Sequence, residues 1–166
     1  MSLHMRPAKP SEADALSALT RRSKGYWGYE PSVLDRMGGT PAVGVAEIRA
    51  GGVVVAERDG TVLGYYQVTG TPPDGELADM FLEPEAIGTG LGRALWEHAV
   101  GWARLAGYRS LRWESDPNAE PFYLRMGAER IGEREVAPGR VLPAMRVTLG
   151  AAHGHGTSAS AAPPPP

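Results

Sequence analysis

The stretch "LEPEAIGTGLGRALWEHAV", Leu82–Val100, decides the fold, because a strand end, a glycine-rich turn and a helix start follow one another within it. Its glycines alternate at Gly88, Gly90 and Gly92. Glycine costs backbone entropy, so three glycines at a helix start need a physical reason. In a turn of this kind, free backbone N–H groups and the positive end of the helix dipole converge on one point. The stretch therefore predicts an anion-binding turn, and a tight packing corner is the alternative.

The spacing of these glycines differs from both common nucleotide-binding motifs. The Walker A motif ends in Gly-Lys-Ser/Thr, and this turn does not. In the dinucleotide motif Gly-x-Gly-x-x-Gly, the third glycine would fall on Arg93 when counted from Gly88, and on Leu95 when counted from Gly90. Glu114 does stand at about the distance of a ribose-binding acid. The hypothesis of an NAD-dependent oxidoreductase is thus weakened but stays an alternative.

Composition is that of a single globular domain. The chain has 166 residues, 42% of them hydrophobic and 22% charged, and we expect one domain over residues 4–149. A net charge of -2 argues against a nucleic-acid partner, because phosphate binding needs clustered Lys and Arg. The absence of cysteine excludes disulfides, thiolate metal sites and a cysteine nucleophile. No apolar run approaches the roughly 20 residues that span a bilayer, and the N-terminus has no secretory apolar core. We expect a cytoplasmic protein without a membrane partner.

The C-terminal segment "GAAHGHGTSASAAPPPP", residues 150–166, has no large apolar residue. Such a segment cannot bury enough surface to offset the entropy of ordering, so it predicts a disordered tail. His153 and His155 fall short of the four rigid ligands of a zinc site, and we expect no metal there.

Periodicity and turn residues predict the elements of the domain. A capped amphipathic helix is expected over "SEADALSALTRR", and a hairpin over "VVVAERDGTVLGYYQV" around Asp59 and Gly60. A third strand, "ELADMFL", precedes the glycine turn, and the following helix ends at Gly107. The strand "SLRWES", the short helix "NAEPFYLRM" ending at Gly127, and the strand "VLPAMRVTL" complete the order. With a strand expected before the first helix, this order predicts a mixed α/β domain with one central sheet.

Two motifs carry a resemblance to a known family. The Gly-x-Gly-x-Gly turn after a strand ending in Leu-Glu-Pro resembles the pyrophosphate loop Arg/Gln-x-x-Gly-x-Gly/Ala of the GCN5-related N-acetyltransferase (GNAT) superfamily. Gly90 and Gly92 take the two glycine positions, and Ile87 stands in place of Arg or Gln. This departure removes one side-chain contact, while the backbone amides from Gly88 to Arg93 remain available for a pyrophosphate.

The second motif is "DPNAEPFYLRMGAE", residues 116–129, which is similar to the superfamily segment Asn-x-x-Ala/Pro-x-x-x-Tyr-x-x-x-Gly. Asn118, Phe122, Tyr123 and Gly127 carry this likeness. Two motifs about thirty residues apart, in the right order and on the right elements, are much more specific than either alone. The resemblance covers nearly the whole domain.

The resemblance implies a fold and an activity. The fold would be a predominantly antiparallel central sheet flanked by helices. The activity would be direct transfer of an acetyl group from acetyl-CoA, without a metal, to a small-molecule amine or a protein amine, and a homodimer would be compatible with it. A non-catalytic acyl-CoA-binding regulatory module is the alternative. The residues expected at the cofactor are Met80, Phe81, Leu82, Ile87, Gly88, Thr89, Gly90, Leu91, Gly92, Arg93, Asn118 and Tyr123.

Acetyl transfer to an amine needs a base, donors for the oxyanion and an acid for the thiolate. The superfamily often places a glutamate where Glu76 stands, at the start of the third strand. Asp79 is the competing base, since a carboxylate amid "LADMFL" would be partly desolvated. We expect Tyr123 to be the acid, because a phenol can donate to a thiolate. The alternatives are a solvated carboxylate at Glu76 and a core tyrosine at Tyr123.

The loop "GYWGYE", residues 25–30, is the candidate for acceptor binding. Tyr26, Trp27 and Tyr29 would form an aromatic wall, and Glu30 would attract an amine by its charge. Packing of these aromatic rings against the sheet is the alternative interpretation.

Overall fold

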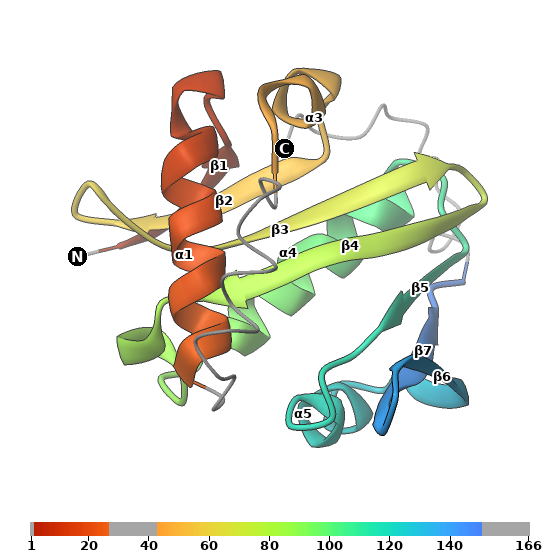
Figure 1. Ribbon diagram of the computed structural model, residues 1–166. Helices are drawn as coiled ribbons and strands as arrows, with labels where there is room; N and C mark the ends of the chain where they lie inside the picture. Colours follow the sequence, from red (N-terminus) through yellow and green to blue (C-terminus); the bar gives the residue numbers. More distant parts are fainter. Residues whose placement is uncertain (1, 27–42, 151–166) are drawn as a thin grey trace. The chain divides into compact units, whose positions relative to one another are not determined.

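The computed structural model describes residues 2–26 and 43–150, and its elements follow the predicted order with two additions (Figure 1). The strands are β1 (Leu3–Pro7), β2 (Val53–Arg58), β3 (Thr61–Thr71), β4 (Asp74–Leu82), β5 (Ser110–Glu114), β6 (Glu129–Ala137) and β7 (Arg140–Thr148). The helices are α1 (Ala13–Tyr26), α3 (Val45–Ala50), α4 (Leu91–Leu105) and α5 (Glu120–Arg125), with 3-10 turns η1 (Pro10–Glu12) and η2 (Pro84–Ala86). The additions are α3 and β6.

The strands hydrogen-bond in the order β1-β2-β3-β4-β5-β7-β6. The β4–β5 pair is parallel, whereas β1–β2, β2–β3, β5–β7 and β6–β7 are antiparallel. The predicted mixed α/β fold with a mainly antiparallel sheet is therefore confirmed. The predicted hairpin is also present, because Asp59 and Gly60 join β2 to β3 with φ angles of 53° and 81°. Two successive positive φ angles give a turn whose twist matches that of the strands.

Contacts divide the described chain into two units, and β3, β4 and α4 each run through both. The first unit contains the residues up to Gln67 together with Asp79–His98, and the second contains Val68–Ala78 and the residues from Ala99 on. One domain over residues 4–149 stays a prediction. Of the predicted tail, only Gly150 lies within the described residues.

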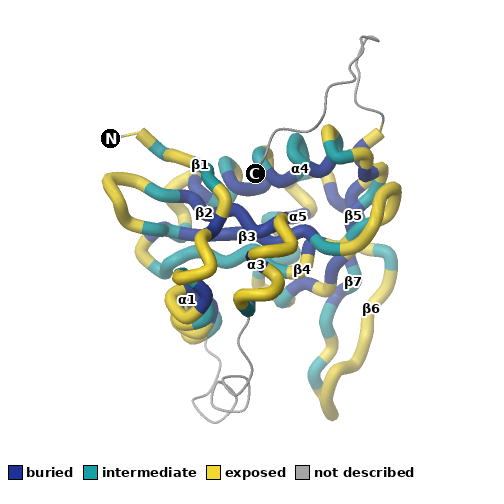
Figure 2. Tube along the Cα trace, turned by 90° about the horizontal axis from the view of Figure 1, so that it is seen from above, coloured by how far each residue is buried: buried dark blue, intermediate teal, exposed yellow. Residues whose placement is uncertain are grey.

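In the first unit, α1 covers one face of β2 and β3 (Figure 1). Leu16 and Leu19 of α1 belong to one buried cluster with Val53, Val55 and Tyr65, and the buried parts of β2 and β3 are dark blue in Figure 2. Burial of apolar side chains of this size stabilises a fold by about 1.5–3 kcal/mol each. The face of β2 and β3 that contacts α1 is thus held mainly by aliphatic packing.

Two adjacent tyrosines of β3 contact the helices on the two faces of this strand. Tyr65 faces α1, where its hydroxyl lies 2.7 Å from the hydroxyl of Thr20. Tyr66 faces α4, where its hydroxyl lies 2.7 Å from Nδ1 of His98. Successive side chains of a strand point to opposite faces, so neighbouring residues can contact two different helices. Both rings are buried, and each hydroxyl has a polar partner.

In the second unit, the strand registers align side chains across β4, β5, β7 and β6. The parallel β4–β5 register runs over Asp74–Glu76 and ends with Glu76 opposite Arg112. The unit is closed on one face by α5, whose Tyr123 ring lies 5.0 Å from the ring of Trp113 on β5. Tyr108 anchors the end of β3, because its hydroxyl donates to the carbonyl oxygen of Gly70 at 2.8 Å.

Two predicted helix starts need correction. The Lys9 backbone N–H donates to the Glu12 carboxylate at 2.8 Å, so the first helix opens with a 3-10 turn that begins at Pro10, before the predicted start. The short helix predicted over "NAEPFYLRM" begins later, at Glu120, with Ala119 as its N-cap, and no side chain caps it. Instead the Asn118 backbone N–H donates to the Asp116 carboxylate at 2.7 Å in a turn before the helix.

Candidate functional site

The glycine turn lies in the first unit and contains two kinds of glycine. Gly88 and Gly90 have φ angles of 83° and 94°, a region that L-residues rarely adopt. Gly92 lies instead in the first turn of α4 with ordinary helical geometry. Two of the three glycines are thus required by backbone conformation. Thr89 closes the turn, because its hydroxyl and its N–H both donate to the Ala86 carbonyl oxygen, at 2.5 and 3.3 Å.

The turn presents a set of backbone donors that the chain does not use. Ile87 and Thr89 donate their N–H groups to Pro84 and Ala86. Within the described residues no hydrogen bond engages the remaining five backbone N–H groups of the turn, those of Gly88, Gly90, Leu91, Gly92 and Arg93. Residues 88–90 are exposed, and the 15-residue α4 begins directly after them. This donor set and the helix dipole fit a phosphate or pyrophosphate group.

The segment Met80–Leu82, whose three residues are predicted to lie at the cofactor, is half-buried at the end of β4. Lys24 of α1 lies over the Phe81 ring, with its Nζ 5.4 Å from the ring centroid. Arg22 donates twice to the Glu83 carboxylate, and this ion pair raises the pKa of the guanidinium. These contacts tie α1 to the segment and to the residue that follows it. Residues far apart in the sequence make them, so no local pattern could indicate them.

Asp79, the competing base, also lies in the first unit. It is half-buried on the opposite face of β4 from Glu76, as the alternation of a strand requires. The pKa of Tyr65 is raised mainly by burial of the tyrosine, and the negative charge of Asp79 raises it further. The negative charge of Asp79 therefore acts on the buried Tyr65 hydroxyl.

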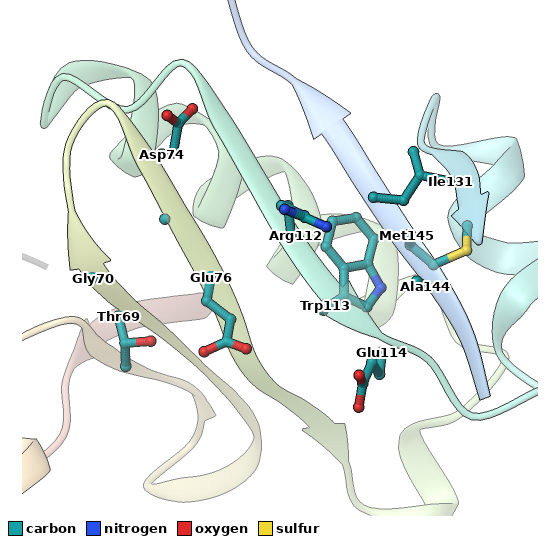
Figure 3. Close-up of a pocket in the computed structure, with 11 residues that line it drawn as sticks. Thr69, Gly70, Asp74, Glu76, Arg112, Trp113, Glu114, Ile131, Ala144 and Met145 are labelled. Carbon is teal, nitrogen blue, oxygen red and sulfur yellow. The ribbon is translucent and has the colours of Figure 1, made fainter. Parts of the chain in front are cut away.

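Glu76 lies in the second unit and lines a cavity of about 370 Å³ (Figure 3). The side chain is exposed, and neither a hydrogen bond nor an ion pair holds its carboxylate within the described chain. The cavity crosses β3, β4, β5, β7 and β6. It is lined by Thr69, Gly70, Asp74, Gly75, Glu76, Arg112, Trp113, Glu114, Ile131, Ala144 and Met145.

Tyr123 is 8% exposed and packs between aromatic neighbours, with Trp113 at 5.0 Å and Phe122 at 5.2 Å between ring centroids. Trp113 also lines the cavity, so it connects Tyr123 to the site that contains Glu76. Asn118 is exposed in the turn before α5, and its backbone is held by Asp116. The second unit thus contains one predicted base, the predicted acid and Asn118.

The predicted acceptor loop is described only in part. Tyr26 is the last residue of α1 and is 54% exposed. Trp27, Tyr29 and Glu30 lie outside the described residues. Across residues 2–26 and 43–150, no cluster of three His, Asp or Glu side chains could hold a metal, and no helix has the length and apolar character needed to cross a membrane.

One pair in the first unit escapes sequence reasoning altogether. His98 of α4 has no local motif, yet it contacts the Tyr66 hydroxyl, and burial lowers the pKa of its imidazole. Burial also raises the pKa of Tyr66, so its hydroxyl keeps its proton and can donate to neutral His98. The two residues are separated by 32 positions, and only the fold brings them together.

Comparison with known proteins places this geometry in context. The sequence profile of the acetyltransferase (GNAT) family matches residues 17–128. No curated protein sequence gives a significant match. The fold is similar to that of PaiA N-acetyltransferase from Thermoplasma acidophilum in complex with coenzyme A, with a TM-score of 0.74 and 16% identity over 89% of this chain and 99% of that one.

Two further solved structures have the same fold. The ribosomal-protein-S18-alanine N-acetyltransferase from Escherichia coli has a TM-score of 0.69 and 16% identity, over 95% of this chain and 99% of that one. N-acetylglutamate synthase from Neisseria gonorrhoeae, complexed with coenzyme A and N-acetyl-glutamate, has a TM-score of 0.64 and 19% identity, over 90% of this chain and 35% of that one. At these identities the likeness shows the fold alone.

Proposed function

The chain belongs to the acetyltransferase (GNAT) family, and from this membership we propose that it transfers an acetyl group from acetyl-CoA to a primary amine in a ternary complex. The observation that carries the proposal is the glycine turn, whose five backbone N–H groups are left without an acceptor in the described chain. The solved complexes of two structural neighbours with coenzyme A support the same co-substrate. The chain has no cysteine, so no acyl-cysteine intermediate can form, and this favours direct transfer.

Acetyl-CoA is the co-substrate in this proposal, and most of the residues proposed to hold it lie in the first unit. The turn N–H groups from Gly88 to Arg93 would bind the pyrophosphate through the backbone, because Ile87 cannot donate a side-chain hydrogen bond. Backbone N–H groups of Met80–Leu82 would bind the pantetheine arm and stabilise the tetrahedral oxyanion. Asn118 would add a side-chain amide contact to the same arm.

Glu76 would accept the proton of the attacking amine through a water. Its exposed carboxylate lines the cavity and has no competing partner in the described chain, which is what a base needs. Asp79 is the second candidate, a half-buried residue on the opposite face of β4 from Glu76. Loss of the proton gives the amine the lone pair with which it attacks the acetyl carbon.

Tyr123 would donate its proton to the departing thiolate. Its ring is fixed between Trp113 and Phe122, so the hydroxyl keeps one position, as a general acid requires. The phenol would then recover a proton from solvent, while the amine proton leaves through Glu76. The overall reaction converts amine and thioester into amide and thiol.

The test is acetyl transfer from acetyl-CoA to a broad amine panel by Glu76→Gln, Asp79→Asn and Tyr123→Phe variants. Loss of a positioned acid or base lowers kcat by about 10²–10⁴-fold, and we expect this for Glu76→Gln and Tyr123→Phe. Matched controls are Glu133→Gln on exposed β6 and Tyr108→Phe, whose hydroxyl donates to the Gly70 carbonyl oxygen.

Unchanged transfer in both Glu76→Gln and Tyr123→Phe would show that other groups act as base and acid. A large loss in Asp79→Asn alone would move the base to that residue. Binding of acetyl-CoA without acetylation of any amine in the panel would indicate the regulatory module instead of the enzyme.

A further inference from the structure

Glu76 and Arg112 are two opposite charges that lie side by side without pairing. They face each other in the parallel β4–β5 register, and both line the cavity (Figure 3). Neighbouring strands are about 4.8 Å apart, so the two long side chains could form an ion pair easily. Within the described chain, however, no hydrogen bond or ion pair engages either of them.

The same register continues the row of charges across the sheet. Arg112 stands opposite Arg146 of β7, and Arg146 stands opposite Glu129 of β6. Residues directly opposite each other share a face, so the row reads Glu76, Arg112, Arg146, Glu129. Arg146 lies 3.6 Å from the Glu129 carboxylate, which closes the outer pair. Like charges directly opposite are destabilising, so Arg112 beside Arg146 favours an additional anion.

The other charged groups of the cavity already have partners. Arg134 reaches Glu114 with two hydrogen bonds, at 2.6 and 3.1 Å. Asp74 accepts a hydrogen bond from the Ser110 hydroxyl at 2.8 Å. Of the ionisable groups that line the cavity, Glu76 and Arg112 are the two that the described chain leaves open. One is an acceptor for a cation, and the other is a donor for an anion.

We infer that the acceptor is a small amino acid, whose ammonium group binds Glu76 and whose carboxylate binds Arg112. This inference rests on the proposed function and names its substrate class. A guanidinium binds a carboxylate through two parallel N–H···O bonds, which a simple amine could not use. A primary amine and a carboxylate joined by a short carbon chain match two side chains on adjacent strands. Arg112 would orient the amine so that Glu76 can take its proton.

The test compares amino acids with their amides and with the corresponding decarboxylated amines, for wild type, Arg112→Gln and Arg112→Lys. We expect Arg112→Gln to lower kcat/KM for the amino acids by roughly 10- to 100-fold, mainly through KM, because a charge-assisted hydrogen-bond pair is lost. The amides and plain amines should change by less than about twofold, since they lack the carboxylate. Arg112→Lys should recover part of the loss, because it keeps the charge but not the bidentate geometry.

Arg109→Gln is the control, an exposed arginine of the same unit that does not line the cavity. Equal effects of Arg112→Gln on amino acids and on amides would overturn the inference while leaving acetyl transfer intact. If no acceptor is acetylated at all, the proposed function fails. Binding of the amino acids, measured by saturation-transfer NMR, then decides: binding that Arg112→Gln abolishes supports the amino-acid site, and absence of binding to wild type overturns it.

Discussion

At the scale of single residues, the three glycines of the turn have different reasons to be glycine. Gly88 and Gly90 have positive φ angles, whereas Gly92 lies within the first turn of α4. A Cβ at Gly88 or Gly90 would meet no atom within 4 Å, so backbone strain and not a clash disfavours substitution there. The open space around both positions is also the space that a phosphate would need.

We expect Gly90→Ala to destabilise the protein by about 1–2 kcal/mol, because an L-residue is strained at its φ of 94°. The affinity for coenzyme A should fall as well, since the turn would change shape. The control is Gly101→Ala in the middle of α4, where a Cβ meets nothing and the helix should gain about 0.5–1 kcal/mol. Urea denaturation and titration calorimetry with coenzyme A measure both quantities. A stabilising Gly90→Ala would contradict the strain argument.

The Tyr66–His98 pair predicts a pH dependence of stability. Burial lowers the pKa of His98 below its ordinary 6.5, so the unfolded chain binds more protons than the folded one just below that pH. The stabilisation is therefore complete above about pH 6.5 and is lost as the pH falls through the folded pKa. Melting temperatures at pH 7.5 and 5.5 should differ less in His98→Gln than in wild type. His4→Gln, an exposed histidine on β1, should keep the wild-type difference.

At the scale of elements, local patterns were sufficient wherever a turn or a helix start is written in adjacent residues. The hairpin at Asp59 is of this kind and has the predicted turn, and the glycine turn lies between a strand and a helix as its neighbouring residues indicate. The strand β6, "ERIGEREVA", escaped prediction because it is charged and mostly exposed, as Figure 2 shows, so no apolar alternation marks it. It is defined by its pairing with β7.

Contacts between distant elements could not be read from the sequence for a related reason. Arg22 and Glu83 are separated by 61 positions, and Glu114 and Arg134 by 20. Charged side chains are common on any surface, so composition does not indicate which of them pair. The charge row that contains Arg112 likewise depends on strand register, which a one-residue slip would destroy.

Gly64 shows how closely β3, β4 and α4 approach one another in the first unit. An added Cβ would lie 2.8 Å from Cδ2 of Leu82, 3.0 Å from the carbonyl oxygen of Phe81 and 3.0 Å from Cδ1 of Leu95. We expect Gly64→Ala to cost about 1–3 kcal/mol and to weaken coenzyme A binding, because it displaces the proposed pantetheine segment. Gly132→Ala on β6, where a Cβ meets nothing, is the control. Unchanged unfolding in urea would show that the segment can shift freely.

At the scale of the whole molecule, the proposed functions are distributed over both units. The donors for the pyrophosphate lie in the first unit, and Glu76, Arg112 and Tyr123 lie in the second. Three continuous elements, β3, β4 and α4, belong to both. Ligand binding to either group of residues should therefore be visible in the unfolding of the chain, since the elements that carry one group continue into the other.

We expect acetyl-CoA at about one hundred times its Kd to stabilise the protein by about 2.7 kcal/mol, a rise in Tm of roughly 5–10 °C for a chain of this size. NAD at the same concentration should leave Tm unchanged, because the glycine spacing lacks the dinucleotide motif. Ile87→Arg should increase the shift with acetyl-CoA, since it adds a bidentate donor for the pyrophosphate. Val136→Arg, which adds the same charge on exposed β6, should not. A larger shift with NAD than with acetyl-CoA would reject the assignment of the turn.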